Sequence, residues 1–223
     1  MRRHRQKALL VSSIAENEGK STVAANLALA LAEKHKKVLL VDGDLRRPAQ
    51  YKVFEEKGKD RISFSQVLRG EAGWEDAVFY SKRSGIWELF QFRAVREPAG
   101  ILREARLAEL AEEWKREMDY IIIDCSPAAV SVDAEVWVSV ADSVLLVVRE
   151  DWADVRVIND AVDMISQNGT DFTGFVLNAF HREWSQPAGR KEYSYGRAYR
   201  SQDIPGEGLT GRSGEHTARG ERG

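Results

Sequence analysis

A short run of residues near the N-terminus has the composition and spacing of a phosphate-binding loop. Residues 8–13 (ALLVSS) predict a buried strand, and residues 19–22 (GKST) predict the start of a helix a few positions later. In such a strand–loop–helix unit, backbone N–H groups and the helix N-terminus hold phosphate oxygens, a lysine neutralises the terminal phosphates, and a hydroxyl binds Mg²⁺. We therefore expect the chain to bind a nucleoside triphosphate through Lys20 and Ser21.

This loop departs from the usual G-x-x-x-x-G-K-[ST] pattern. Ile14 stands where the first glycine is expected, and Asn17 stands where related loops often carry glycine. Asparagine tolerates a left-handed backbone better than most residues, so a tight turn at Asn17 is still expected. Glu16 and Glu18 make the loop unusually acidic, which predicts weaker ATP binding through like-charge repulsion, offset in part by Mg²⁺. The alternative is a coincidental Gly-Lys-Ser at an ordinary helix start.

Further acidic residues follow two other predicted strands. Residues 38–41 lead directly to Asp42 and Asp44, and residues 120–123 lead to Asp124. Because ligands of parallel α/β sheets bind at the carboxyl ends of the strands, we expect these acids to meet the phosphate-binding loop. Mg²⁺ keeps several waters, so one hydroxyl and one or two carboxylates are enough to hold it. The alternative for each acid is a turn or helix cap.

The apolar pattern along the chain indicates an α/β fold. Continuous apolar runs alternate with helical patterns, which predicts a mostly parallel central sheet with helices on both faces. The expected strands are residues 8–11, 38–41, 86–92, 120–123, 144–148 and 175–177, and the expected helices are residues 23–35, 101–115 and 155–166. Beyond residue 182 glycine is frequent and aliphatic residues are few. Residues 1–181 are therefore expected to form one domain and residues 182–223 a flexible tail.

Composition and charge exclude several classes of function. Of the 223 residues, 43% are hydrophobic and 30% are charged, which is a globular balance. The net charge of −2 argues against a general nucleic-acid binder. The single cysteine, Cys125, excludes an internal disulfide and suits a reducing cytoplasm. No apolar run reaches the roughly 18 residues of a membrane span, and the basic start of the chain is not followed by a cleavage pattern.

Several motifs together resemble the bacterial tyrosine kinases that control capsule and exopolysaccharide synthesis. Residues 12–28 resemble the Walker A motif of that family, residues 38–48 (VLLVDGDLRRP) its second Walker A motif, and residues 120–127 (YIIIDCSP) its Walker B motif. Residues 98–102 resemble the segment that precedes a long helix in the family. The resemblance covers about residues 7–180. It implies a P-loop NTPase fold, in a superfamily that also contains cell-division and partition ATPases of the MinD and ParA type.

The resemblance implies a role for each candidate site residue, with ATP and Mg²⁺ as cofactors. Lys20 is expected to hold the β- and γ-phosphates and Thr22 to contact the α-phosphate, while Asp42 activates the tyrosine hydroxyl. The implied catalytic residues are Lys20, Asp42, Asp44 and Asp124; the nucleotide-binding residues are Asn17, Glu18, Gly19, Lys20, Ser21, Thr22 and Asn178; and the metal-binding residues are Ser21, Asp42 and Asp124.

Two residues near this set keep open alternatives. Asn178 follows the strand expected at 175–177, where members of the superfamily contact adenine, but it also suits a turn after a strand. Asp133 follows the strand that ends at Asp124. It is expected either to sense the γ-phosphate or to cap the next helix.

The predicted tail is rich in tyrosine. Tyr193, Tyr195 and Tyr199 are three of the six tyrosines of the chain, and the kinases that this chain resembles end in a tyrosine cluster that they autophosphorylate. A phenol with a pKa of about 10 needs positioning and a nearby base, and a mobile tail can reach the active site of a neighbour. Phosphorylation of the tail in trans is therefore expected. The alternative is a disordered tail that happens to contain tyrosines.

The resemblance also implies partners and a location. Family members usually carry an upstream helix with a Glu-x-x-Arg-x-x-Arg motif that builds a ring of subunits; this chain begins almost at the first expected strand, so its sequence does not predict a ring. Relatives of this short form depend on a separate membrane protein. We therefore expect a cytoplasmic protein, recruited to the inner face of the plasma membrane by a membrane-embedded polysaccharide co-polymerase that activates it. A protein-tyrosine phosphatase is an expected counterpart, and no nucleic acid is expected.

Two other functions remain beside the ATP-dependent tyrosine kinase. One is a partition or positioning ATPase, a nucleotide-switched binding protein. Such ATPases carry a signature lysine five positions before the loop lysine, where this chain has Ala15. The other is a regulatory relative with weak or no activity, which the altered loop and the missing upstream helix favour.

Overall fold

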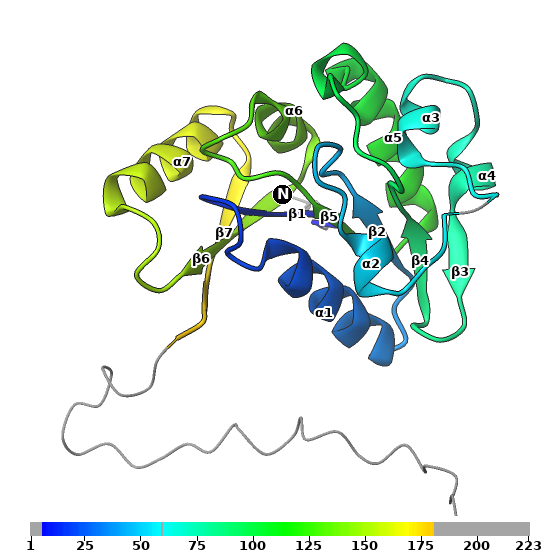
Figure 1. Ribbon diagram of the computed structural model, residues 1–223, viewed down its shortest axis with the longest axis horizontal. Helices are drawn as coiled ribbons and strands as arrows, with labels where there is room; N and C mark the ends of the chain where they lie inside the picture. The colour runs from blue at the N-terminus through cyan, green and yellow to red at the C-terminus, as the bar shows by residue number, and fades with distance from the viewer. Residues whose placement is uncertain (1–5, 59, 181–223) are drawn as a thin grey trace, which may run out of the picture. The chain divides into compact units, whose positions relative to one another are not determined.

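The computed structural model describes residues 6–58 and 60–180. Within these residues a seven-stranded sheet has the strand order β3-β4-β2-β5-β1-β6-β7 (Figure 1). Its strand pairs are parallel except for β3 with β4, which are antiparallel. The structure therefore confirms the predicted α/β fold with a mostly parallel sheet. The tyrosine cluster at Tyr193, Tyr195 and Tyr199 lies outside the described residues.

The strands differ in burial according to their place in the sheet. Every residue of central β2 is buried, which is why its sequence is a continuous apolar run up to Asp42. The edge strand β7 alternates between exposed and half-buried residues, so only part of it was visible as an apolar run. The strands are β1 (Ala8–Ser13), β2 (Val38–Asp42), β3 (Phe79–Ser81), β4 (Ile86–Leu89), β5 (Tyr120–Asp124), β6 (Ser143–Arg149) and β7 (Asp171–Asn178).

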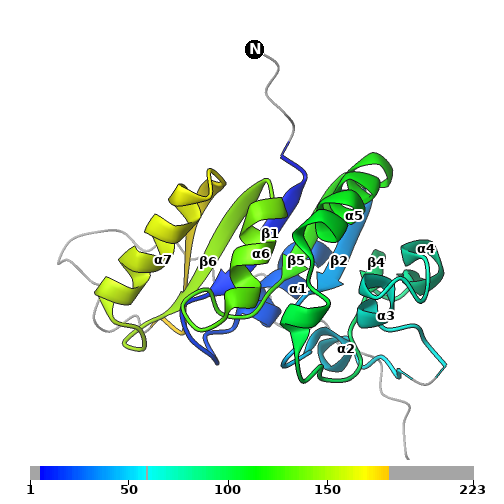
Figure 2. The same cartoon turned by 90° about the horizontal axis from the view of Figure 1, so that it is seen from above.

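Helices cover both faces of the sheet, as predicted (Figures 1 and 2). α1 and α2 lie on one face, where Ala24 and Ala28 pack against strand residues such as Leu40. α5, α6 and α7 cover the other face, where Trp114 and Trp137 are buried. The helices are α1 (Lys20–Glu33), α2 (Gln50–Val53), α3 (Phe64–Leu68), α4 (Trp74–Ala77), the 3₁₀ turn η1 (Pro98–Gly100), α5 (Glu104–Glu117), α6 (Val132–Val140) and α7 (Val155–Gln167).

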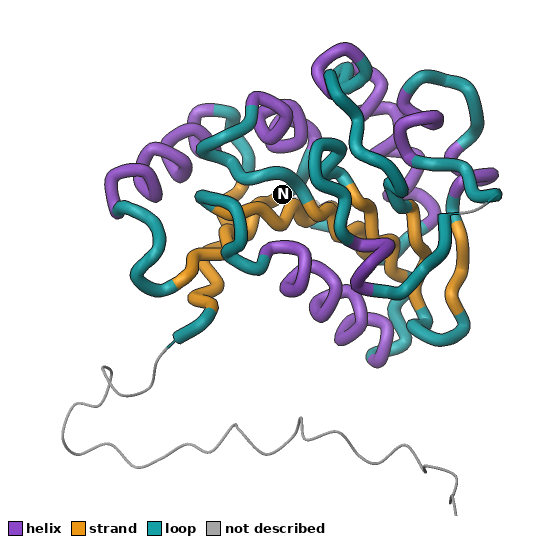
Figure 3. Tube along the Cα trace, viewed as in Figure 1, coloured by secondary structure: helices purple, strands orange, loops and turns teal. Residues whose placement is uncertain are grey.

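Several short elements were not predicted. α2, α3, α4 and β3 have only three to five residues each, too few to show a helical or alternating period. α6 has nine residues, and its sequence shows no clear apolar face, because exposed Val132 and buried Asp133 interrupt the pattern. Figure 3 shows how helices and loops are arranged around the strands of the sheet. In the part of the chain that the structure describes, every helix is too short or too polar to cross a membrane.

A buried carboxyl group lies in β4, away from the phosphate-binding loop. The side chain of Glu88 is 2% exposed, and its Oε1 accepts a hydrogen bond of 3.1 Å from the Ser84 hydroxyl. Its Oε2 has no hydrogen-bond partner among the described residues. Burial raises the pKa of Glu88 from 4.5 to about 7. The folded chain therefore holds a proton on Glu88 under conditions in which the unfolded chain has released it.

This proton makes the stability of the fold depend on pH. Between pH 4.5 and about 7 the folded state binds more protons than the unfolded state, so the free energy of unfolding falls as the pH rises through this window. Replacing Glu88 by Gln removes the ionisable group and keeps its shape. We expect the melting temperature of Glu88→Gln to exceed that of the wild type at about pH 8, with a smaller difference at about pH 5.

Thermal denaturation followed by circular dichroism at several pH values measures this difference. The exposed Glu135 on α6 provides a matched control, and Glu135→Gln is expected to leave the pH dependence unchanged. A melting-temperature difference between Glu88→Gln and wild type that does not change with pH would contradict the prediction.

Candidate functional site

The loop between β1 and α1 has two left-handed backbone positions. Asn17 has a φ of 64° and Gly19 a φ of 92°. The left-handed turn expected at Asn17 is therefore confirmed. At Gly19 the positive φ disfavours any side chain, and a Cβ there would lie 2.2 Å from the Asn178 side-chain nitrogen, which would have to move. The loop can thus turn tightly into α1, which begins at Lys20.

Glu18 holds the loop from the inside. Its side chain is fully buried, Oε2 accepts a hydrogen bond of 2.6 Å from the Ala15 N–H, and Oε1 accepts one of 3.2 Å from the Arg149 N–H. Asn178 at the end of β7 donates a hydrogen bond of 2.8 Å from Nδ2 to the Glu18 carbonyl. The ends of β6 and β7 therefore fix the phosphate-binding loop in place.

These contacts change the interpretation of the acidic loop. Because the carboxylate of Glu18 is used by backbone N–H groups, it is not aimed at a bound phosphate, and Glu16 forms an ion pair with Arg47. The expected like-charge repulsion is therefore reduced for both acids. In the structure Glu18 and the Asn178 amide brace the loop, and neither side chain is among the described residues that line the pocket.

Lys20 lies between two carboxylates. Its Nζ is 2.9 Å from Asp44 Oδ2 and 3.7 Å from Asp124 Oδ1, and it donates a hydrogen bond of 3.3 Å to the Ser21 hydroxyl. Burial by itself would lower the pKa of Lys20, but the charges of Asp124 and Asp44 outweigh it and raise this pKa above its ordinary value. Lys20 is therefore a permanent positive charge at the start of α1.

Asp42 and Asp124 face each other at the ends of β2 and β5. The two residues are paired in register, and both side chains are fully buried. Burial and the nearby Asp124 charge raise the pKa of Asp42 well above its ordinary value. Burial also raises the pKa of Asp124, although Lys20 opposes this shift. One oxygen of each, Oδ1, has no hydrogen-bond partner within the described ranges.

Gln50 joins these acids, and the sequence analysis did not identify it. Its backbone N–H donates to Asp42 Oδ2 at 3.0 Å, while its Nε2 donates to Asp124 Oδ2 at 2.8 Å and to the Ser21 carbonyl at 3.0 Å. Gln50 is fully buried at the start of α2. It lies eight residues after Asp42 and two residues beyond Pro48, where the recognised motif ends, so the sequence did not mark it as a site residue.

Gly43 sets the spacing between Asp42 and Asp44. A Cβ at Gly43 would lie 2.9 Å from the Trp137 ring and 3.0 Å from the Asp124 carbonyl oxygen. The Gly43 N–H donates to that carbonyl at 2.8 Å, and the Trp137 indole N–H donates to the Gly43 carbonyl at 3.3 Å. The two acids are therefore separated by a glycine that the core holds on both sides.

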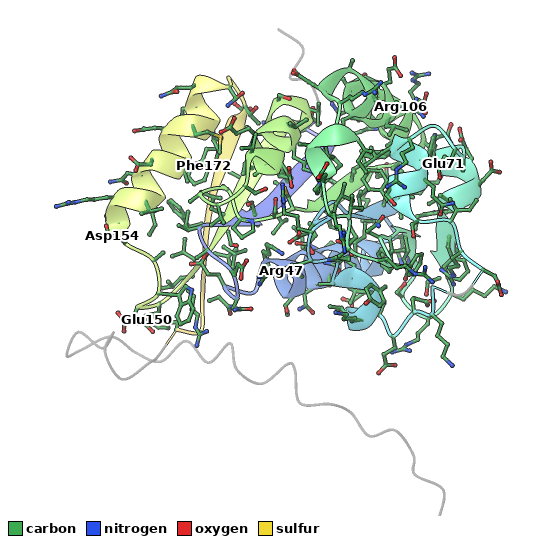
Figure 4. The ribbon with its side chains drawn as sticks, turned by 45° about the horizontal axis from the view of Figure 1, so that its top comes forward. Arg47, Glu71, Arg106, Glu150, Asp154 and Phe172 are labelled. Atoms are coloured by element: carbon green, nitrogen blue, oxygen red, sulfur yellow. The ribbon has the colours of Figure 1, made fainter. Side chains whose placement is uncertain are left out.

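These residues surround a pocket of about 570 Å³. Asn17, Gly19, Lys20, Ser21, Thr22 and Asp44 line it, whereas Asp42 and Asp124 lie buried behind it. Arg46 and Arg47 form part of the wall, and Arg47 is marked in Figure 4. Arg46 forms an ion pair of 2.6 Å with Asp133, so Asp133 is an arginine partner, while the cap of α6 is the hydroxyl of Ser131.

The pocket fits the phosphates of a nucleotide and a magnesium ion. Backbone N–H groups at the start of α1 and the charge of Lys20 suit phosphate oxygens. Among the described residues no group of three or more His, Cys, Asp and Glu side chains could hold a metal by itself. The Ser21 hydroxyl and the Oδ1 atoms of Asp42 and Asp124, which accept no hydrogen bond among the described residues, nevertheless suit Mg²⁺, which also takes phosphate oxygens and waters.

Comparison with known proteins assigns the family. Residues 13–167 match the model of a family described as an AAA domain. The tyrosine-protein kinase CpsD of Streptococcus agalactiae is 30% identical to this chain over 172 residues, which cover 77% of this chain and 75% of that protein. The chain belongs to the bacterial tyrosine-protein kinases. The crystal structure of the VpsO kinase domain agrees, with 30% identity, a TM-score of 0.73, and coverage of 79% of this chain and 86% of that chain.

The tyrosine-kinase fold is shared with cell-division ATPases. The septum site-determining protein MinD of Pyrococcus horikoshii, solved in complex with Mg-ADP, is 29% identical, with a TM-score of 0.68 over 79% of this chain and 71% of that chain. The resemblance to bacterial tyrosine kinases found in the sequence is therefore confirmed, and so is the P-loop fold. As a member of this family, the chain is a nucleotide-binding protein.

The buried brace at Glu18 generates a prediction for this kinase-family member. Glu18→Ala leaves the Ala15 and Arg149 N–H groups without their acceptor, so the free energy of unfolding is expected to fall by about 1–3 kcal/mol. Nucleotide affinity is expected to fall as well, because the loop is no longer held. Urea denaturation and titration with a fluorescent ATP analogue measure the two effects.

Glu16 in the same loop supplies the matched control. Its pair with Arg47 is exposed to solvent, so Glu16→Ala is expected to change stability by less than about 0.5 kcal/mol. Equal losses in Glu16→Ala and Glu18→Ala would contradict the bracing role of Glu18.

Proposed function

We propose that the protein is an ATP-dependent protein-tyrosine kinase that acts in capsule or exopolysaccharide synthesis and export. The observation that carries this proposal is the placement of Lys20 between Asp44 and Asp124 at the start of α1, in a chain that belongs to the bacterial tyrosine-protein kinases. The positive charge of Lys20 is available for terminal phosphates, and the carboxylates beside it suit a metal ion and a proton acceptor.

Magnesium would be held by Ser21, Asp42 and Asp124. Asp42 Oδ1 supports this choice, because a buried carboxylate oxygen without a hydrogen bond needs a cation or a proton, and Asp124 Oδ1 already lies 3.7 Å from the cationic Lys20 Nζ. A bound Mg²⁺ would supply charge neutralisation for the phosphates of ATP. It would also favour the ionised forms of Asp42 and Asp124, whose pKa values burial raises.

We assign the proton acceptor to Asp44 in preference to Asp42. Asp44 lines the pocket, whereas Asp42 is fully buried and its Oδ2 accepts hydrogen bonds from the N–H groups of Ala49 and Gln50. In the transfer step the tyrosine oxygen attacks the γ-phosphorus, the bond to the β–γ bridging oxygen breaks, and ADP leaves. The phenol proton passes to Asp44. Bound phosphates compete with Asp44 for Lys20, which frees the carboxylate for this role.

The acceptor tyrosines of the proposal are Tyr193, Tyr195 and Tyr199. We propose that residues 182–223 form a flexible tail beyond a kinase domain at 1–181, and that the tail of one copy is phosphorylated by another. A membrane-embedded polysaccharide co-polymerase would recruit and activate the kinase at the inner face of the plasma membrane, and a protein-tyrosine phosphatase would reverse the reaction. The support is the tyrosine-rich sequence and the family to which the chain belongs.

A partition or positioning ATPase is the second candidate. The fold similarity to MinD favours it, because that protein was solved with Mg-ADP in a related fold. Ala15, at the position of the signature lysine of such ATPases, argues against it. The kinase is therefore the function that the site and the family support best.

Incubation of the purified protein with Mg-ATP, followed by detection of phosphotyrosine, tests the proposal. The assay is run with and without a cytoplasmic peptide of the co-polymerase, and we expect a signal that Lys20→Met abolishes and that the triple change of Tyr193, Tyr195 and Tyr199 to Phe mostly removes. The absence of phosphotyrosine under both conditions would exclude the kinase. ATP hydrolysis without phosphotyrosine would favour the ATPase.

The assignment of Asp44 leads to a separate prediction. Asp44→Asn cannot accept a proton, so tyrosine phosphorylation is expected to fall by about 10²-fold or more while nucleotide affinity is retained. Rate and affinity are measured separately, by phosphotyrosine formation and by titration with the fluorescent ATP analogue. The assignment would be wrong if Asp44→Asn remained active while Asp42→Asn lost transfer with its nucleotide affinity intact.

A further inference from the structure

A second pocket lies apart from the nucleotide site and is rich in arginine. It has a volume of about 540 Å³ and lies between residues 58–71, which include α3, and the loop 91–96 that follows β4. Arginine side chains from both segments line it: Arg61, Arg69, Arg93 and Arg96. Among the described lining residues Glu71 is the one acid. Figure 4 labels Glu71 and shows that this end of the molecule lies opposite the end that carries Asp154, at the start of α7.

Most of this positive charge is available to a ligand. Arg61 is already engaged, since it forms an ion pair of 3.0 Å with Glu56 and its guanidinium lies 3.8 Å from the centre of the Phe79 ring. Arg69, Arg93 and Arg96 are exposed and have no ion pair or side-chain hydrogen bond within residues 6–58 and 60–180. Several guanidinium groups around one hollow repel each other, so an anion placed among them would be stabilised.

The walls of this pocket are held by buried contacts. Gln91 is 2% exposed; its Oε1 accepts a hydrogen bond of 2.9 Å from the Ser65 N–H, and its Nε2 donates one of 2.5 Å to the Arg93 carbonyl. The Phe64 N–H donates to the Phe90 carbonyl at 3.0 Å. Loop 91–96 and α3 are thus fixed to each other, and the pocket exists before a ligand arrives.

An aromatic ring lies beside the arginines. Phe92 lines the pocket, and its ring lies 5.9 Å from that of Tyr51, centre to centre. Gly58 packs against Phe92 so closely that a Cβ there would come within 2.6 Å of the ring. The pocket therefore combines a held apolar ring with a group of cations, which suits a ligand that has an aromatic part and a phosphate.

We propose that this pocket binds the phosphotyrosine side chain of a peptide segment. Arginine forks pair bidentately with a phosphate, which carries a charge of about −1.5 to −2 at pH 7, and the phenyl ring of phosphotyrosine packs beside Phe92. Glu71 at the same pocket can pair with one basic residue of such a segment. This proposal rests on the proposed kinase activity for the source of the phosphotyrosine.

The chain itself contains a segment with this chemistry. Tyr193, Tyr195 and Tyr199 are flanked in the sequence by Arg190, Lys191, Arg197 and Arg200. Loop 91–96 is also tied to the nucleotide site, because the Val95 N–H donates to the Leu45 carbonyl at 2.8 Å, next to Asp44. The phosphate of a phosphorylated segment of one copy therefore matches the arginines of the pocket of another copy in charge.

Binding of synthetic peptides to the full-length protein tests this proposal without requiring kinase activity. A fluorescent peptide of residues 188–202 with phosphotyrosine at position 195 is compared with the unphosphorylated peptide by fluorescence polarisation, in the Lys20→Met background so that the protein cannot phosphorylate itself. We expect the phosphopeptide to bind at least about 10-fold more tightly. The double variant Arg93→Gln/Arg96→Gln is expected to remove this difference.

Controls separate the pocket from general charge effects. Arg156→Gln removes an exposed arginine on α7, at the other end of the sheet, and is expected to leave the preference intact. Equal affinity for the two peptides, an undiminished preference in the double variant, or displacement by inorganic phosphate at the same concentration as by free phosphopeptide would overturn the proposal. Because the probes are synthetic, a failure here leaves the phosphotyrosine assay of the kinase unaffected, and the reverse also holds.

Discussion

Lys20 lies between the carboxylates of Asp44 and Asp124 at one edge of the sheet, and the rest of the site depends on this interaction. Asp42 and Asp124 are brought opposite each other by the pairing of β2 with β5, where burial raises the pKa values of both. Two buried carboxylates that face each other disfavour each other's ionised form unless a cation lies beside them. Lys20 supplies that cation in the free protein, and a nucleotide with its metal would replace the contact of Lys20 with Asp44.

The position of Lys20 depends in turn on strands that lie on the other side of β1. Glu18 accepts a hydrogen bond from the end of β6, and Asn178 at the end of β7 donates to the Glu18 carbonyl. These contacts hold the turn through Gly19 that starts α1. The phosphate-binding loop is therefore not an isolated motif but a loop fixed by the carboxyl ends of parallel strands, which is where this type of sheet forms its sites.

The sequence allowed prediction of those elements whose burial leaves a regular pattern of apolar residues. Continuous apolar runs revealed the central strands, because both of their faces are covered, and the acids at their ends were correctly placed beside the loop. Contacts between residues far apart in the chain could not be predicted from the apolar pattern. The burial of Glu18 against Arg149, the bridge formed by Gln50 and the arginine pocket all depend on which side chains the fold brings together. Short elements such as β3 and α3 carry no period to detect.

The contact between Gly43 and Trp137 has a consequence for how this protein can diverge. The packing of Trp137 against Gly43 in the core fixes the spacing of Asp42 and Asp44, so substitutions at the surface do not change it. The rim of the nucleotide pocket is different, because Arg46 and Val130 are exposed there. Substitutions at this rim therefore leave the backbone that spaces the two acids undisturbed.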